Sequence, residues 1–246
     1  MILLYTDFGA EGPYLGQVQA VLHRDAPSIP VTNLLSNAPA GEPELASYLL
    51  AALVPQCPPG AVLVCVVDPG VGGERLPVVL EADGRWLVGP DNGLLNTVGI
   101  QARQAGWQII GWRPAELSSC FHGRDLFAPI AARIARGDFS WRRSGWSGPD
   151  LADWPADRAA VVYCDHYGNA LTGVRYRDEL AGSELVVSGR RLRQAETFCR
   201  VAAGEPFWYC NSLGLVEIAV NRGRADRELG LVPGTDVLIE PSSLTG

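Results

Sequence analysis

The sequence contains no lysine, and all 20 of its basic residues are arginines. A lysine Schiff base, a phosphate-loop lysine and a lysine general base are therefore excluded. The formal net charge is -7 at pH 7, so the chain offers no basic face to a phosphate backbone. We expect no nucleic-acid partner.

Histidine is also scarce, with three residues and none of the HxH, HxxxH or HExxH spacings of zinc sites. The six cysteines never form a CxxC pair, and several lie in apolar runs, which is typical of reduced core thiols. GxGxxG and GxSxG motifs are both missing. We therefore predict no metal, no cofactor, no dinucleotide binding and no serine acyl transfer.

Long apolar stretches are missing as well. No run approaches the roughly 18 residues that a membrane helix requires, and MILLYTDFG at the start shows no charged leader. The hydrophobic fraction of 47% over 246 residues is ample for a sizeable core. We expect a globular, cytoplasmic protein with no membrane contact.

Residues 1–140 alternate short apolar runs with helical patterns, which predicts an α/β domain with a mostly parallel sheet flanked by helices. The expected strands are Ile2–Thr6, Ile29–Leu34, Val62–Val67, Pro77–Leu80, Arg85–Val88 and Trp107–Trp112. The expected helices are Tyr14–His23, Glu42–Leu53 and Leu126–Arg136.

The second part of the chain has a different pattern. Residues 141–159 are rich in Gly, Ser, Pro, Asp and Trp without a sustained period, which predicts a linker. Residues 160–246 contain short apolar runs separated by Gly, Asn and Pro, which favours a small antiparallel β-barrel or sandwich domain.

The stretch VLVCVVDPGVGGER, residues 62–75, raises the first functional question. Its apolar run indicates a strand buried on both faces, and ligands of such sheets bind beyond the carboxyl ends of the strands. Asp68 lies at that end, and Arg75 can return to it from the far side of a glycine-rich loop. The alternative is an aspartate that merely caps a turn.

The turn-cap interpretation weakens because the pattern recurs. Asp7 follows the first predicted strand, Asp91 and Asn92 follow another, and Asp165 and Asn169 follow a fourth. Four polar clusters at strand ends indicate one site.

FHGRDLFAPIAA, residues 121–132, places His122 and Arg124 immediately before an apolar helix, with Asp125 as a candidate N-cap. A histidine at such a junction is a site candidate, although a lone histidine is more often structural.

Several segments taken in order resemble one family. They are TDFG at 6–9, Tyr14 with Gly16, VVDPGVG at 66–72 with Arg75, PDNGLL at 90–95, FHGRDLFAPIAA at 121–132, DHYGN at 165–169 and NSLGLVEIAVN at 211–221. The family is that of the adenosine-forming S-adenosylmethionine (SAM) hydrolases, also called SAM hydroxide adenosyltransferases, which are related to the fluorinase and chlorinase.

The resemblance implies an α/β domain followed by a β-barrel, and a homotrimer with sites between the first domain of one subunit and the second domain of its neighbour. It implies a water-handling set of Asp68, Arg75 and His122. It also implies contacts to adenosine or SAM from Asp7, Phe8, Asp165, Tyr167, Asn169, Ser212, Glu217 and Val220.

The implied reaction is attack of water on ribose C5′ of SAM, giving adenosine and L-methionine. The sulfonium makes methionine a neutral leaving group, so the step requires an aligned water but neither a metal nor a general acid. Whether Asp68 or His122 accepts the proton stays open at this stage.

Two alternatives remain. Halide transfer to the same carbon is disfavoured because Asp68, Arg75 and His122 are all retained. A non-catalytic adenosine or SAM sensor is suggested by departures from the family pattern, in YLGQVQA at 14–20, where Gln19 and Ala20 replace lysine and glycine, and in TNLLSNAP at 32–39. An acidic residue expected shortly after DFG is replaced by Glu11-Gly12-Pro13.

Overall fold

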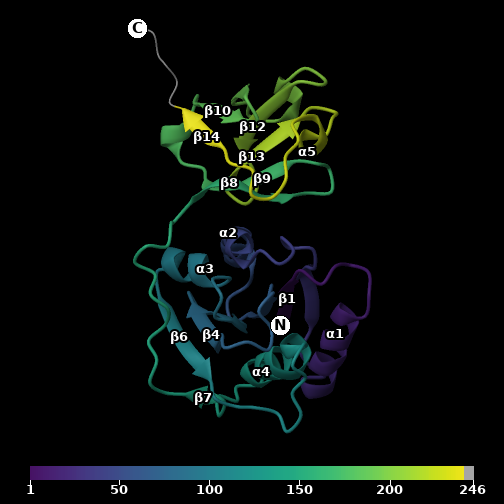
Figure 1. The fold of residues 1–246 in the computed structure, drawn as a ribbon, viewed down its shortest axis with the longest axis vertical. Helices are drawn as coiled ribbons and strands as arrows, with labels where there is room; N and C mark the ends of the chain where they lie inside the picture. The colour runs from purple at the N-terminus through teal and green to yellow at the C-terminus, as the bar shows by residue number, and fades with distance from the viewer. Residues whose placement is uncertain (241–246) are drawn as a thin grey trace. The chain divides into compact units, whose positions relative to one another are not determined.

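The computed structural model describes residues 1–240, which form two compact units, the first of them Met1–Ala156 and the second beginning at Asp157 (Figure 1). No helix within this range is long and apolar enough to cross a membrane. Residues 141–156, predicted as part of a linker, cluster with the first unit. Trp154 Nε1 donates to Thr97 Oγ1 over 2.9 Å, and Tyr48 Oη donates to the Pro155 carbonyl over 3.0 Å.

The first unit is built on a sheet of seven strands in the described range, in the order β2-β1-β3-β5-β4-β6-β7. The strands are β1 Ile2–Thr6, β2 Val31–Leu35, β3 Val62–Val66, β4 Pro77–Ala82, β5 Arg85–Pro90, β6 Ala105–Ile110 and β7 Arg142–Arg143. The helices are α1 Tyr14–Asp25, α2 Pro43–Leu53, α3 Asn96–Gln101 and α4 Ala128–Ala135, with short helical turns η1 Val54–Gln56 and η2 Gly123–Phe127.

The sheet is mixed and not mostly parallel. Strands β2, β1, β3 and β5 are parallel, whereas β4, β6 and β7 join by antiparallel pairs. The β4–β5 pair is antiparallel because of the two-residue turn Asp83–Gly84, in which both residues have positive φ (47° and 75°). So short a connection closes a hairpin and cannot make the crossover that parallel strands require.

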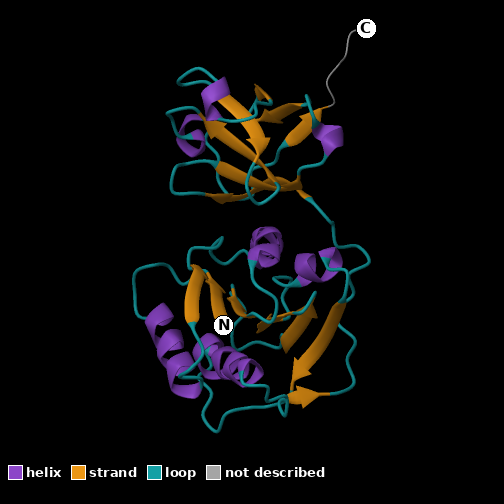
Figure 2. Cartoon of the chain, turned by 180° about the vertical axis from the view of Figure 1, so that it is seen from behind, coloured by secondary structure: helices purple, strands orange, loops and turns teal. Residues whose placement is uncertain are grey.

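Helices cover both faces of this sheet (Figures 1 and 2). On one face, alternate residues Ile2 and Leu4 of β1 pack in a buried cluster with α1 and α4. On the other face, Tyr5 Oη donates to the Ala46 carbonyl of α2 over 2.8 Å. The strand is therefore buried on both sides, as its continuous apolar sequence predicts.

The second unit consists of antiparallel sheets, one of three strands (β11-β10-β14) and one of four (β12-β13-β9-β8) in the described range. The elements are β8 Arg158–Cys164, β9 Ala170–Arg175, β10 Glu184–Val187, β11 Arg190–Arg193, β12 Pro206–Cys210, β13 Leu215–Val220, β14 Leu238–Glu240, α5 Ala225–Glu228, η3 Asp178–Leu180 and η4 Phe198–Arg200. Their inner residues form a separate core around Trp208.

Candidate active site

A small hollow of about 140 Å³ lies beyond the carboxyl ends of β1 and β3 in the first unit. Asp7 and Asp68 follow these two neighbouring parallel strands, so both reach the same edge of the sheet. Phe8 and His122 also line the hollow. The polar residues at the strand ends therefore predict correctly that Asp7 and Asp68 lie at the same edge of the sheet.

Arg75 joins Asp68 to His122. Its Nε lies 2.9 Å from each oxygen of Asp68, its Nη2 donates to Oδ2 of the same carboxylate, and Nη2 also lies 2.9 Å from His122 Nδ1. The side chains of Arg75 and Asp68 are only 10% and 3% exposed, so this is a desolvated ion pair with fork geometry. Arg75 thus contacts both of the other residues predicted to handle water.

The contact fixes the hydrogen position on His122. Arginine has five N–H donors and no acceptor, so Nδ1 must accept from Arg75 through its lone pair. The neutral ring then carries its hydrogen on Nε2. Burial lowers the pKa of His122 from its ordinary 6.5, and the adjacent Arg75 lowers it further, which agrees with a neutral ring.

The loop between Asp68 and Arg75 is held against the segment that carries His122 by a close backbone approach. Gly72 has φ of 81°, and a Cβ atom placed there would lie 2.5 Å from the Ser119 carbonyl oxygen. Only glycine satisfies both demands, positive φ and this distance. The glycine of DPGVG is therefore required by the neighbouring loop.

Asp7 and the nearby residues Thr6 and Gly9 are held by main-chain groups of the 36–41 segment. Gly41 N donates to Asp7 Oδ2 over 2.9 Å, Gly9 N donates to the Ser36 carbonyl and Ala38 N donates to the Thr6 carbonyl. Burial raises the pKa of Asp7, while the Gly41 hydrogen bond opposes that rise. The segment 32–39, which departs from the family pattern, still supplies two of these backbone contacts, because they do not depend on side-chain identity.

Asp91 and Asn92, which follow β5, lie outside the hollow. Asn92 Nδ2 donates to the Val67 carbonyl over 2.9 Å and so fixes the backbone beside Asp68. Asp91 is partly buried, which raises its pKa. Neither residue lines the hollow that Asp7 and Asp68 share. Asp91 and Asn92 therefore do not share this hollow with Asp7 and Asp68, contrary to the prediction from the recurring strand-end pattern.

A larger hollow of about 730 Å³ lies in the second unit. Every residue of this unit that the family resemblance implied as a binding residue lines it, namely Asp165, Tyr167, Asn169, Ser212, Glu217 and Val220. The turn between β8 and β9 provides the first three, and the β12–β13 region provides the others. Asp165 accepts from the backbone N (2.8 Å) and the side-chain Nδ2 (3.0 Å) of Asn169, which fixes that turn.

Two aromatic residues that were not predicted from the sequence also line this hollow. Phe198 and Tyr209 face it with rings 5.5 Å apart, and Tyr209 Oη donates to Glu217. Asn211 Nδ2 donates to the other Glu217 oxygen over 2.7 Å. Burial raises the pKa of Glu217, and the two donors oppose the rise. Flat rings beside fixed polar groups suit a heteroaromatic ligand.

Asp125 differs from its predicted position as an N-cap. The helix begins earlier, with a wide turn over Gly123–Phe127, so Asp125 lies inside that turn. Its carboxylate instead accepts from Ser118 N over 3.1 Å. Within residues 1–240, no group of three His, Cys, Asp or Glu side chains is placed to hold a metal ion.

Two family models match this chain. A model described as the SAM hydroxide adenosyltransferase N-terminal domain matches residues 2–145, and one described as the C-terminal domain matches residues 159–238. An (R)-S-adenosyl-L-methionine hydrolase of Thermus thermophilus is 38% identical, over 96% of this chain and 98% of the relative. A protein of the same name from Salinispora arenicola is 34% identical over 95% of each chain.

Solved structures are similar over nearly the whole chain. An uncharacterized conserved protein from Thermotoga maritima matches with a TM-score of 0.83 and 28% identity, over 97% of this chain and 99% of that one. A conserved hypothetical protein from Thermus thermophilus matches with a TM-score of 0.76 and 35% identity, over 97% and 98% of the two chains.

Proposed function

This chain belongs to the SAM hydroxide adenosyltransferase family, and from that membership we propose that it hydrolyses S-adenosyl-L-methionine to adenosine and L-methionine. The family predicted from the motifs is thereby confirmed. One observation carries the proposal: in a chain that matches SAM hydrolases over nearly its full length, Asp68, Arg75 and His122 form one connected set at a hollow.

The proposed reaction is an in-line displacement. The water oxygen forms a bond to ribose C5′ while the C5′–S bond breaks, and the electron pair of that bond neutralises the sulfonium. The leaving group is the neutral thioether of L-methionine, and one water proton must be taken up or released. Fixing the water in line with the C–S bond contributes several kcal/mol of the barrier reduction, about 7 or more in well-aligned systems.

The hydrogen positions favour Asp68 as the proton acceptor. Neutral His122 has its Nδ1 lone pair engaged by Arg75 and its hydrogen on Nε2, so it acts as a hydrogen-bond donor to the water. Arg75 can only donate. Asp68 is the one member of the set with spare lone pairs, and a positioned general base of this kind contributes roughly 10²–10⁴ in rate.

The other predicted residues are assigned to substrate binding. Asp7 and Phe8 line the first hollow beside Asp68, where a carboxylate suits ribose hydroxyls and lowers the cost of desolvating a sulfonium. Asp165, Tyr167, Asn169, Ser212, Glu217 and Val220 line the second hollow and are assigned to the nucleoside.

A homotrimer completes the proposal, as the family resemblance implies. The first hollow, about 140 Å³, is well below the roughly 300–1,000 Å³ typical of ligand pockets, so a second wall from elsewhere is needed. We assign that wall to the second unit of a neighbouring subunit. Closure of the second unit's sheets into a β-barrel and a cytoplasmic location belong to the same proposal.

The names of the relatives specify the R configuration at the sulfonium. The sulfonium is pyramidal, so its two epimers direct the methyl group and the methionine chain differently from C5′. We assign the R epimer as the substrate of this chain. Separate incubation with each purified epimer tests the assignment, and consumption of the S epimer alone would refute it.

The activity is tested by incubating the purified protein with the R epimer of SAM and measuring adenosine by chromatography. Asp68→Ala is expected to abolish adenosine formation, whereas Asp138→Ala, which removes a surface ion pair with Arg133, is expected to retain it. An unchanged amount of the R epimer after prolonged incubation with ample wild-type enzyme would overturn the proposal.

Neither alternative function is favoured. Halide transfer would give a 5′-halo-5′-deoxyadenosine in chloride or fluoride buffer, and we expect adenosine alone. A sensor would bind adenosine in a calorimeter without consuming SAM, and we expect consumption.

A further inference from the structure

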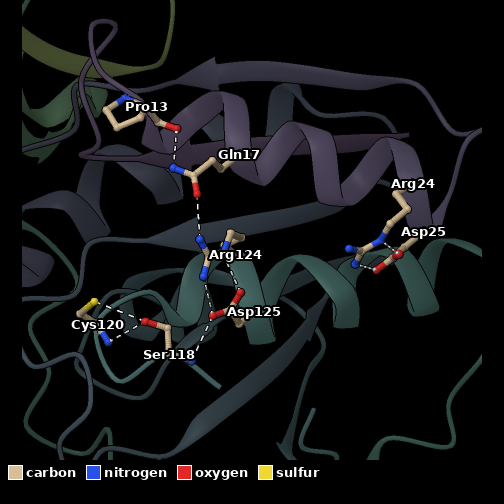
Figure 3. Close-up of polar contacts among 8 residues, drawn as sticks. All are labelled: Pro13, Gln17, Arg24, Asp25, Ser118, Cys120, Arg124 and Asp125. Atoms are coloured by element: carbon tan, nitrogen blue, oxygen red, sulfur yellow. Dashed lines mark hydrogen bonds and ion pairs between the residues drawn. The ribbon is translucent and has the colours of Figure 1, made fainter. Parts of the chain in front are cut away.

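The Arg124 side chain connects the η2 turn, in which it lies, to helix α1 (Figure 3). Its Nη1 donates to Gln17 Oε1 over 2.8 Å, and Gln17 Nε2 donates to the Pro13 carbonyl over 3.0 Å. Its Nε and Nη2 donate to the two oxygens of Asp125 over 2.6 and 3.0 Å. A continuous chain of hydrogen bonds thus runs from the start of α1 to the first turn before α4.

Asp125 extends this chain toward His122. Its Oδ2 accepts from Ser118 N over 3.1 Å, and Ser118 Oγ in turn accepts from Cys120 N over 3.4 Å. These contacts fix the course of residues 118–120, which lead directly into Phe121 and His122. The carboxylate therefore orders the segment that carries the imidazole.

The same guanidinium also packs on an aromatic cluster. Arg124 Cζ lies 5.0 Å from the centre of the Phe121 ring. Phe121 meets Phe8 edge-on at 5.7 Å and Tyr14 edge-on at 5.4 Å. Phe8 and Phe121 line the hollow from different segments, one after β1 and one before η2. Arg124 thus contacts the Phe121 ring directly, and it reaches the segment after β1 indirectly, through Gln17 and the Pro13 carbonyl.

A second pair in the same view shows what an ordinary surface pair looks like. Arg24 and Asp25 form the same adjacent, two-contact ion pair at the end of α1, with distances of 2.7 and 3.2 Å. Their side chains are 70% and 26% exposed, against 33% and 17% for Arg124 and Asp125. Within residues 1–240 the Arg24–Asp25 pair bonds to no loop of the hollow, and such exposed pairs contribute little.

We propose that Arg124 is a positioning residue, which, through Gln17 and Asp125, sets the separation of the Phe8 and Phe121 segments and the orientation of His122 toward Arg75. The inference rests on the proposed hydrolysis for its kinetic consequence but not for its structural one. Arg124 itself does not line the first hollow, so its effect on the reaction must pass through the residues that it holds.

The test compares Arg124→Met and Gln17→Met with Arg24→Met, the matched surface control. A displacement of about 1 Å in catalytic groups can cost on the order of 10²-fold in rate. We expect kcat for adenosine formation to fall about tenfold to a hundredfold in Arg124→Met, and less in Gln17→Met, with KM changed less than about threefold. Gln17→Glu keeps an oxygen for Arg124, so it is expected to restore kcat. Arg24→Met is expected to match wild type.

The structural readout is independent of turnover. The chain has only three histidines, His23, His122 and His166, so ¹⁵N side-chain spectra contain few signals and can be assigned by single substitutions. We expect Arg124→Met to move the His122 nitrogens away from the Nε2–H pattern while leaving His23 unchanged. The charged groups around His122 are Arg75, Asp68, Arg113 and Asp125, and all remain in this variant.

The kinetic and spectroscopic results distinguish failure of this inference from failure of the proposed function. Wild-type His122 shifts and wild-type kcat in both methionine variants would overturn the inference, as would a loss of activity that merely follows a loss of folded protein. If Arg124→Met does not fold, Gln17→Met carries the decision alone. If wild type consumes no SAM, the proposed function fails, while the spectra still decide whether Arg124 orients His122.

Discussion

The guanidinium of Arg75 donates a hydrogen bond to Nδ1 of His122 over 2.9 Å while it also holds both oxygens of Asp68. One cation therefore orients a carboxylate and an imidazole at the same time. It disfavours protonation of the imidazole at Nδ1 and leaves the other nitrogen as a donor. Asp68 is therefore the acceptor of the three, and Arg75 and His122 are donors. The next predictions, on the ion pair and on the titration of His122, depend on this arrangement.

The buried ion pair makes a stability prediction. Arg75→Met leaves the carboxylate of Asp68, only 3% exposed, without its cation, and we expect a loss of about 3–5 kcal/mol in the free energy of unfolding. The double variant Asp68→Leu/Arg75→Met removes both charges and is expected to lose much less. Urea unfolding measures both, and equal losses in the two variants would contradict the ion-pair explanation.

The titration of His122 gives a prediction with a definite sign. Burial and Arg75 lower its pKa in the folded protein below the ordinary value of 6.5, so the folded state binds the proton less readily than the unfolded state. The stability contribution of the neutral ring is full above pH 6.5 and is lost as pH falls through the lowered pKa.

An NMR titration of the three histidines is expected to place the His122 midpoint below 6.5. Protonation at Nδ1 would set two donors against each other, so kcat should fall on the acid side over the same pH range. A midpoint above 6.5 would show that Asp68 and Asp125, which favour the charged ring, outweigh burial and Arg75.

Gly72 offers a test of the contact between loops. Gly72→Ala combines φ of 81° with a Cβ atom 2.5 Å from the Ser119 carbonyl oxygen, whereas Gly84→Ala meets open space at φ of 75°. Both should lose about 1–2 kcal/mol from the left-handed backbone. Only Gly72→Ala is expected to lose activity as well, because the loops that carry Arg75 and His122 must move apart. Equal activity in the two variants would refute this.

Complementation tests whether neighbouring subunits share a site. Asp68→Ala disables the first hollow, and Asn169→Ala together with Tyr209→Ala disables the second. If sites join two subunits, co-refolding equal amounts of the two inactive variants should restore about a quarter of wild-type activity, since about one site in four combines two intact halves. Each variant refolded alone is the control. Recovery at the level of these controls would mean that each subunit forms its own site.

The sequence predicts most strands of the first unit, and the edge of the sheet at which Asp7 and Asp68 meet, for physical reasons. Continuous apolar runs such as VLVCV are typical of buried strands, and strand β1 is found at Ile2–Thr6 as expected. Polar residues that end neighbouring parallel strands must meet at one edge, which places Asp7 beside Asp68. Both features can be predicted because they depend on residues that are close together in the sequence.

The errors concern features that depend on distant contacts or on short elements. The turn at Asp83–Gly84 reverses the chain and makes the β4–β5 pair antiparallel, although both flanking strands were expected. Strand β11, Arg190–Arg193, cannot be predicted from an apolar run, because RRLR contains one apolar residue. Asp125 was misassigned because its true partner, Ser118 N, lies upstream in a loop and not in the helix that follows.

The attachment of residues 141–156 to the first unit has a practical consequence for dissecting the enzyme. A fragment that stops at residue 140 would remove the Trp154 indole from the Thr97 hydroxyl and the Pro155 carbonyl from the Tyr48 hydroxyl. A fragment that ends at Ala156 keeps these contacts, because the first unit includes residues 141–156. That junction is the natural place to exchange the second half for the corresponding half of a relative.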